Sequence, residues 1–300
     1  MSLGFRVVSY EPARRSALLG LMREVWGSAR LERELEWWFE RNPAGSPLIS
    51  LAEHDGRVVG VACMSPYRVR LDGEEVIAPV PLHVATHPAW RGRGVFSALE
   101  EENERRAAER WPVALTFPNR ASARVFAGKL GWSELPGARV WARTVVERRL
   151  PAGVEVVREV GPEADERWRA LAPAYGNGLF RDRAYLEWRF AAAPRRYTLL
   201  ASRDGLAVAG QRTVRGREVA YLAELVAPPG AEARRLARAA LAATCARLFL
   251  ALPLHGRGGE LARLGFLPTP KRIAFMAKAL RPEARIPGSW TLSLGDGDSW

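Results

Sequence analysis

The sequence predicts an α+β protein made of two tandem domains of one fold, each a mixed, mostly antiparallel sheet flanked by helices. One observation behind this prediction is an internal repeat that runs in the same order through both halves of the chain. The other is the order of strand-type and helix-type apolar patterns in each half, with hairpin turns first and a β-α-β crossover afterwards. The 300 residues are enough for two cores of ordinary size.

The repeat is visible in several pairs of segments. WWFERNP in the first half is echoed by WRFAAAP in the second, with a tryptophan, a phenylalanine and a proline at constant spacing. VALTFP resembles LFLALP, and KLGW resembles RLGF, in the same order. Repeats of this kind indicate duplicated structural units. We therefore expect a first domain at residues 1–150, a second at 151–280 and an acidic tail at 281–300.

The elements of the first copy follow from periodicity and turn residues. Alternating apolar residues predict strands, and apolar residues three and four apart predict helices. An Asp-Gly pair at 55–56 predicts a hairpin turn. In chain order we expect a strand at 5–9, helical segments that end before residue 42, strands at 48–53, 58–64 and 76–86, a helix at 95–110, a strand at 112–117, a helix at 121–130 and a strand at 138–146.

Composition describes an ordinary globular chain with an excess of positive charge. Lysine and arginine total 45 against 33 acidic residues, and the formal net charge is +12. The arginines are interspersed with acids, so we expect no face for nucleic acid. No apolar run approaches the roughly 18 residues of a membrane span, and the N-terminus lacks a signal-peptide pattern. Two widely separated cysteines predict no disulfide framework and favour the cytoplasm.

The segment HVATHPAWRGRGVFSALEEE, which begins at His83, combines the features of an anion site. A strand ends in the Arg-Gly-Arg-Gly turn at 91–94, and a helix follows. The first amides of a helix lack partners and its dipole is positive there, while glycine lets a phosphate approach the backbone. The spacing does not fit a Walker loop, and the preceding hairpins do not fit a dinucleotide-binding βαβ unit. On the pattern alone, a basic surface turn is the other interpretation.

VATHPAWRGRGVFSAL resembles the signature of GNAT N-acetyltransferases, in which Arg/Gln-x-x-Gly-x-Gly/Ala binds the pyrophosphate of acyl-CoA. NRASARVFAGKLGW, after the strand PVALTF, resembles the second motif of that family. The resemblance covers residues 1–150 and, more weakly, 151–280. It implies a sheet whose fourth and fifth strands splay apart around acetyl-CoA as co-substrate, with no metal. The residues that it assigns to acetyl-CoA are Val84, Ala85, Thr86, Arg91, Gly92, Arg93, Gly94, Val95, Phe96 and Asn119.

The sequence departs from the family pattern at several positions. Phe96 stands where Gly or Ala is usual, and Phe126 or Ala127 stands in place of the Tyr that protonates the leaving thiolate in many members. In the second copy, the Pro-Pro pair at 228–229 removes amides that a pyrophosphate would need. We therefore expect CoA binding in the first domain only, with the second as a scaffold and lid. Glu224 is expected to be a structural or substrate-cleft carboxylate.

The resemblance implies transfer of an acetyl group from acetyl-CoA to an amine of a small-molecule or peptide acceptor by direct attack. His83 is the candidate general base, because an imidazole side chain titrates at about pH 6.5 and can accept a proton. The residue also precedes the backbone that is expected to meet the thioester. On a regular strand, His83, Ala85 and His87 share one face. The alternatives are a CoA-binding or partner-binding module whose chemistry has lapsed, and an aminoacyl or thiol-sugar acyltransferase. The acceptor and the oligomeric state are not predicted.

Two further features have two interpretations each. A set of tryptophans lines either an acceptor cleft or the core, namely Trp37, Trp38, Trp90, Trp132 and Trp188. The tail SLGDGDSW either docks on the arginine-rich body or frays as a free terminus. Docking would use the terminal carboxylate, two acids and two apolar anchors, namely Asp296, Asp298, Trp290 and Trp300.

Overall fold

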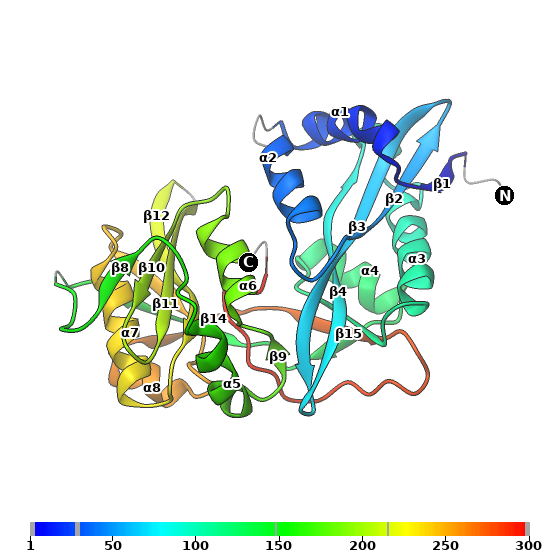
Figure 1. Ribbon diagram of the computed structural model, residues 1–300. Helices are drawn as coiled ribbons and strands as arrows, with labels where there is room; N and C mark the ends of the chain where they lie inside the picture. Colours follow the sequence, from blue (N-terminus) through cyan, green and yellow to red (C-terminus); the bar gives the residue numbers. More distant parts are fainter. Residues whose placement is uncertain (1–3, 28–30, 148, 215, 298–300) are drawn as a thin grey trace. The chain divides into compact units, whose positions relative to one another are not determined.

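The computed structural model describes residues 4–27, 31–147, 149–214 and 216–297. It confirms the α+β class, with largely antiparallel sheets flanked by helices (Figure 1). The chain forms two compact units. Unit 1 comprises Met1–Arg68, Val76–Glu134 and Phe275–Ile286, and unit 2 comprises Val69–Glu75, Leu135–Ala274 and Pro287–Trp300.

The main sheet of unit 1 is the expected hairpin sheet. Its strands lie in the order β1-β2-β3-β4, with β1 and β2 and then β2 and β3 antiparallel. Their bounds are β1 (Arg6–Ser9), β2 (Leu48–His54), β3 (Arg57–Leu71) and β4 (Glu74–Thr86). Strand β3 is much longer than the predicted 58–64, and its far end pairs with the short strand β9 (Gly178–Leu179) inside unit 2.

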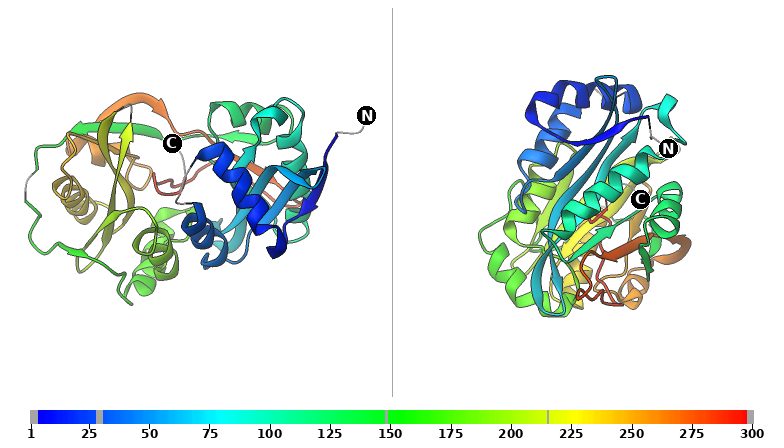
Figure 2. Two further views of the ribbon diagram at one scale, coloured as in Figure 1. Left: turned by 90° about the horizontal axis from the view of Figure 1, so that it is seen from above. Right: turned by 90° about the vertical axis from the view of Figure 1, so that its right-hand side faces the viewer.

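Helices cover both faces of this sheet, and each helix turns an apolar stripe toward it. On one face, Leu18 and Met22 of α1 pack with Leu51 and Val61 of the sheet. On the other, helix α3 packs its Leu99 with Ala52 of β2 and with Val59 and Ala62 of β3, and Figure 2 (right) shows α3 crossing in front of the strands. The helical elements between β1 and β2 are η1 (Pro12–Arg14), α1 (Arg15–Trp26), α2 (Leu31–Leu35) and η2 (Glu36–Glu40), and those after β4 are η3 (Pro88–Trp90) and α3 (Val95–Ala108).

A second, smaller sheet completes unit 1. It has the order β5-β15-β6, with bounds β5 (Val113–Thr116), β15 (Phe275–Ala279) and β6 (Ser133–Leu135), and helix α4 (Arg120–Gly128) lies between β5 and β6 in the chain. Strand β15 comes from the C-terminal half of the sequence and pairs antiparallel with β5. The apolar pattern does not reveal this pairing, because a strand that alternates correctly fits either copy of a repeated sheet.

Unit 2 repeats the same order of elements in one sheet, β14-β7-β13-β12-β11-β10-β8. Its strands are β7 (Arg139–Thr144), β8 (Glu155–Val157), β10 (Tyr197–Ala201), β11 (Leu206–Val214), β12 (Arg217–Val226), β13 (Leu248–Ala251) and β14 (Leu267–Arg272). Its helical elements are α5 (Ala164–Tyr175), α6 (Arg183–Leu186), η4 (Glu187–Ala191), α7 (Ala231–Ala242) and α8 (Gly258–Arg263). Leucines and alanines of α7 form the centre of its core against β10 to β12.

The internal repeat read from the sequence corresponds to repeated structure. The WWF and WRF segments form equivalent π-helical turns, η2 and η4, each followed by the first strand of a hairpin. The compact units do not follow the predicted boundaries at 150 and 280. Strand β7, the end of the first sequence copy, lies in the sheet of unit 2, and β15, the end of the second copy, lies in unit 1. The two copies have exchanged their last strands.

Candidate functional site

In unit 1 the strands on either side of helix α3 belong to different sheets. Strand β4 is the last strand of the main sheet, and β5 is the first of the smaller sheet. The chain therefore leaves one sheet at Thr86, passes through the turn and α3, and enters the other sheet at Val113. Strands β4 and β5 are therefore not hydrogen-bonded to each other, and the N-terminus of α3 follows the turn after β4.

The Arg-Gly-Arg-Gly turn has a conformation that depends on its glycines. Gly92 has φ +77° and Gly94 has φ +81°, the left-handed region that favours glycine. A Cβ atom at either position would meet nothing within 4 Å, so the space in front of the turn is open. Gly94 is the N-cap of α3, and no side chain of the described residues caps this helix end. The first helical amides are therefore available to an anion.

The arginines of the turn are exposed, as an anion site requires. Arg91 and Arg93 both lie at the surface, and the Arg93 guanidinium stacks 4.9 Å from the centre of the Trp90 ring. Two exposed guanidinium groups beside uncapped amides give a site of positive charge with forked donors. These features fit a phosphate group on geometric and electrostatic grounds.

The first turn of α3 accommodates the unusual Phe96 without blocking the N-terminus. Val95 is fully buried against the main sheet. Phe96 packs edge-to-face on Phe126 of α4, with ring centres 5.6 Å apart. Phe126 is itself buried beside Trp132, whereas Ala127 is exposed. Neither residue at the usual Tyr position carries a hydroxyl, so the structure supplies no general acid there.

Strand β4 is irregular at His83. This residue has φ +50°, which is uncommon for any residue except glycine and marks local strain. Its ring lies in an aromatic enclosure, with centre-to-centre distances of 6.1 Å to Trp26, 5.6 Å to Trp38 and 5.8 Å to Phe39. These rings come from α1 and η2, on the face of the sheet opposite α3. His83 therefore faces the side away from the helix that begins at the Gly-Arg turn.

The residues that follow His83 bear out the expected alternation. Ala85 packs in the apolar cluster of α1, and Nε2 of His87 lies 3.3 Å from a carboxylate oxygen of Glu24 on that helix. Val84 packs instead with the cluster of α3. His87 also accepts a hydrogen bond at Nδ1 from the amide of Ala89, 3.2 Å away, so it shapes the turn.

Asn119 lies at the exit of β5. Its side-chain Oδ1 accepts hydrogen bonds from the amides of Ala121 at 2.9 Å and Ser122 at 3.0 Å, which makes it the N-cap of α4. The residue is exposed, so capping α4 does not remove it from solvent. Its contact with acetyl-CoA stays a prediction.

Most of the tryptophans that had two interpretations are core residues. Trp90 is partly exposed and stacks with Phe5 in an edge-to-face pair. The other four are at most 5% exposed, namely Trp37, Trp38, Trp132 and Trp188. Trp38 nevertheless forms part of the enclosure around His83.

Helix α3 buries an acidic side chain that no local pattern in the sequence predicts. Glu100 is fully buried and both of its carboxyl oxygens lack a hydrogen-bond partner among the described residues. Burial, with a contribution from Glu104, raises the pKa of Glu100 well above its ordinary value. Asn103, one turn further on, is satisfied by Ser50 Oγ at 2.7 Å and the Ala62 carbonyl at 3.0 Å. In the run LEEENERR, Glu100 is indistinguishable from its exposed neighbours.

In unit 2 the equivalent region contains a buried charge cluster instead of a Gly-Arg turn. The loop before α7 carries Pro228 and Pro229, as the sequence shows. Glu224 is buried and its Oε1 lies 2.9 Å from Nε of Arg181, which is also fully buried. The sequence analysis does not identify Arg181, because nothing local distinguishes it from the many surface arginines.

Among the described residues, no group of three His, Cys, Asp or Glu side chains could hold a metal ion. Of the helices in the described ranges, none has both the length and the apolar character that crossing a bilayer requires. Cys63 is buried and Cys245 is exposed, and both are free thiols.

The comparisons with known proteins agree with this geometry. Residues 8–135 match the family model described as "Acetyltransferase (GNAT) domain". The matched part of the chain includes the Gly-Arg turn and is similar to GNAT acetyltransferase domains. No curated protein matches the sequence.

Solved structures of GCN5-related N-acetyltransferases share the fold over most of the chain. The protein from Anabaena variabilis superposes with a TM-score of 0.70 at 15% identity, covering 92% of this chain and 73% of the other. The one from Kribbella flavida gives a TM-score of 0.64 at 17% identity, with 92% and 72% covered. Eis1 from Mycobacterium abscessus gives 0.60 at 15% identity, with 92% and 73% covered.

Proposed function

We propose that the protein transfers an acetyl group from acetyl-CoA to an amine of a small-molecule or peptide acceptor by direct attack. The observation that carries this proposal is the Gly-Arg turn at an uncapped helix N-terminus, placed where β4 and β5 belong to separate sheets. The turn offers amide donors and positive charge to a pyrophosphate, and β4 and β5 are not paired with each other, which supports a donor site between them. Cysteine usage favours a reducing compartment such as the cytoplasm.

The residues have separate roles in this proposal. Arg91, Arg93 and the amides of 94–96 bind the pyrophosphate, because opposite charge and unpaired donors converge there. A backbone amide within 84–86 polarises the thioester carbonyl, which increases the positive character of its carbon. Acetyl-CoA supplies the activated acyl group, and the protein supplies position and electrostatics.

His83 is proposed as the general base. An amine attacks only when it is neutral, so a proton must be removed from the acceptor before or during attack. His83 precedes the backbone assigned to the thioester and lies on the face opposite α3, among the rings of Trp26, Trp38 and Phe39. This arrangement lets donor and acceptor approach β4 from different sides.

A second candidate is a CoA-binding module whose chemistry has lapsed. The observation that favours it is the replacement of the usual Tyr by the buried Phe126 and the exposed Ala127. Direct attack with a water as proton donor to the thiolate does not need that Tyr. We therefore favour the acetyltransferase over the lapsed CoA-binding module.

Incubation with acetyl-CoA and a panel of amines separates these candidates. We expect release of the CoA thiol together with acetylated amine, detected by mass spectrometry. Binding of CoA without acetylation of any amine would favour the lapsed module. Turnover with aminoacyl donors or thiol-sugar acceptors alone would instead assign the protein to another acyl-transfer class.

A further inference from the structure

Unit 2 has its own opening between the strands that correspond to β4 and β5. Strands β12 and β13 are parallel and pair only at the start, from Val219–Leu248 to Tyr221–Leu250. Beyond these pairs lies a pocket lined by Leu222, Glu224 and Leu225 of β12 and by residues 252–255 after β13. The duplicated fold therefore contains an opening at the place that corresponds to the proposed donor site of unit 1.

Residues 291–296 of the C-terminal tail lie in this opening. Residues 291–294 line the same pocket. The Gly295 amide donates a 2.7 Å hydrogen bond to the carbonyl of Ala223 on β12, and the Thr291 amide donates one of 2.8 Å to the carbonyl of Asn177. Leu292 and Leu294 are buried beside it. This confirms docking for the described part of the tail, whereas Asp298 and Trp300 lie outside the described residues.

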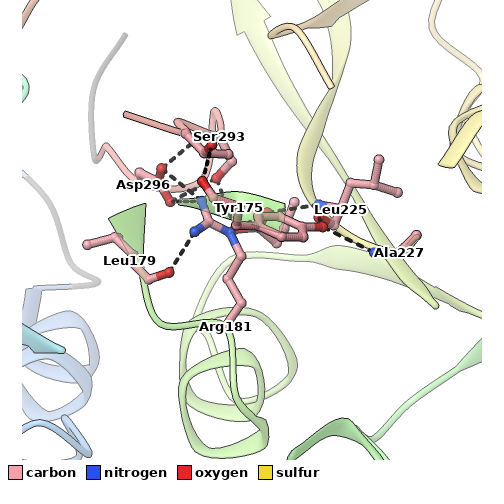
Figure 3. Close-up of polar contacts among 9 residues, drawn as sticks. Tyr175, Leu179, Arg181, Leu225, Ala227, Ser293 and Asp296 are labelled. Atoms are coloured by element: carbon pink, nitrogen blue, oxygen red, sulfur yellow. Dashed lines mark hydrogen bonds and ion pairs between the residues drawn. The ribbon is translucent and has the colours of Figure 1, made fainter. Parts of the chain in front are cut away.

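A buried arginine holds the tail by charge. Nη2 of Arg181 lies 3.2 Å from both carboxylate oxygens of Asp296, and its Nη1 donates to the carbonyl of Leu179 at 2.6 Å (Figure 3). Ser293 Oγ lies 3.0 Å from Glu224 Oε2. Arg181 and Asp296 are at most 3% exposed, so water does not solvate either charge. Each charge is stabilised by the other and by the hydrogen bonds around the pair.

The tail also fits closely into the opening of unit 2. A Cβ atom on Gly295 would lie 2.7 Å from the Ala223 carbonyl oxygen and 2.7 Å from Cζ of Phe190. A Cβ on Gly178 would lie 2.8 Å from the carbonyl oxygen of Thr291. Gly288, earlier in the tail, has nothing within 4 Å of such an atom. Close approach is thus confined to the segment inside the opening.

We propose that the opening of unit 2 is a binding site for an extended peptide with an aspartate, and that the tail is its resident ligand. Backbone hydrogen bonds, buried leucines and a carboxylate on arginine are the contacts by which proteins recognise extended peptides. The tail closes this opening to other ligands. The proposal concerns unit 2 alone and does not depend on acyl transfer in unit 1.

The first part of the test uses the full-length Gly295→Ala variant, with Gly288→Ala as the matched control. In Gly295→Ala the added methyl group meets the Ala223 carbonyl and Phe190, so we expect the tail to leave the opening. Hydrogen exchange at the amides of residues 291–296 should become at least about tenfold faster than in the control, because their partners are lost. Chymotrypsin should also cleave the tail faster.

The second part adds the synthetic peptide of residues 287–297. It should bind Gly295→Ala with one site per chain and should not bind Gly288→Ala, whose own tail occupies the site. A peptide with Asp296→Asn should bind at least about tenfold more weakly, since it lacks the carboxylate for Arg181.

Unchanged exchange in Gly295→Ala would overturn the proposal, as would a released tail whose peptide does not bind. Circular dichroism checks that the variant folds. If Gly295→Ala does not fold, full-length Asp296→Asn is compared with Gly288→Ala instead. Unchanged exchange, or a released tail whose peptide does not bind, would again overturn the proposal. A wild-type protein that fails to bind CoA would contradict the function proposed for unit 1 and leave these results unaffected.

Discussion

His83 is the side chain on which the proposed chemistry depends most. We expect His83→Ala to lower turnover by about 10²–10⁴-fold, the usual contribution of general base catalysis. Affinity for acetyl-CoA should be retained, and the acidic limb of the pH–rate profile should disappear. Steady-state kinetics across pH, with the partly exposed His54→Ala as control, checks this. Near-normal turnover in His83→Ala would exclude the assignment.

Glu100 affects the free energy of unfolding. Its carboxyl has a raised pKa in the folded protein, so on raising the pH above the ordinary value near 4.5 the unfolded state loses the proton first. The free energy of unfolding contributed by this group therefore decreases as pH rises. Glu100→Met removes the buried carboxyl, and we expect a gain of about 1–3 kcal/mol at pH 7 that shrinks toward pH 4.5.

Denaturant unfolding at several pH values measures this gain. Glu101→Met, at the exposed neighbouring position, should change the free energy of unfolding by less than about 0.5 kcal/mol. A pH-independent loss of stability in Glu100→Met would show that the carboxyl has a polar partner in solution.

At the scale of elements, the Gly-Arg turn and the start of α3 act as one anion site. Arg91→Ala should weaken CoA binding by about 1–3 kcal/mol, the range of a charge-assisted hydrogen bond. Arg110→Ala, at the opposite end of α3, should have little effect. Titrations at low and high salt check the electrostatic origin, because salt screens exposed charges. Equal effects of both substitutions would contradict a local site.

Element order in each half could be predicted from the sequence, because hairpin turns and apolar periodicity are local signals. The Gly-Arg turn was predictable for the same reason, since left-handed Gly92 and Gly94 are encoded by residue type. The positive φ of His83 was not, because it depends on packing among Trp26, Trp38 and Phe39. The ion pair of Arg181 with Asp296 joins positions far apart in the chain, and no local pattern reports such pairs.

At the scale of the molecule, duplication explains both the resemblance of the halves and their differences. Strands β7 and β15 are exchanged between sheets of the same kind, so each unit contains a strand from the other sequence copy. One copy keeps the glycine turn, and the other has prolines in that loop and its opening filled by the tail. We therefore expect the chain to bind its donor in unit 1 alone.

Calorimetric titration with CoA is the sharpest test of a single CoA site at the Gly-Arg turn. We expect one site per chain in the wild type and no binding in Gly94→Val, because the side chain would occupy the place of the phosphate. Gly131→Val is the matched control, since Gly131 has φ +68° and an equally open surrounding but lies after α4. It should bind as the wild type does. Two equivalent sites, or unchanged binding in Gly94→Val, would contradict the account.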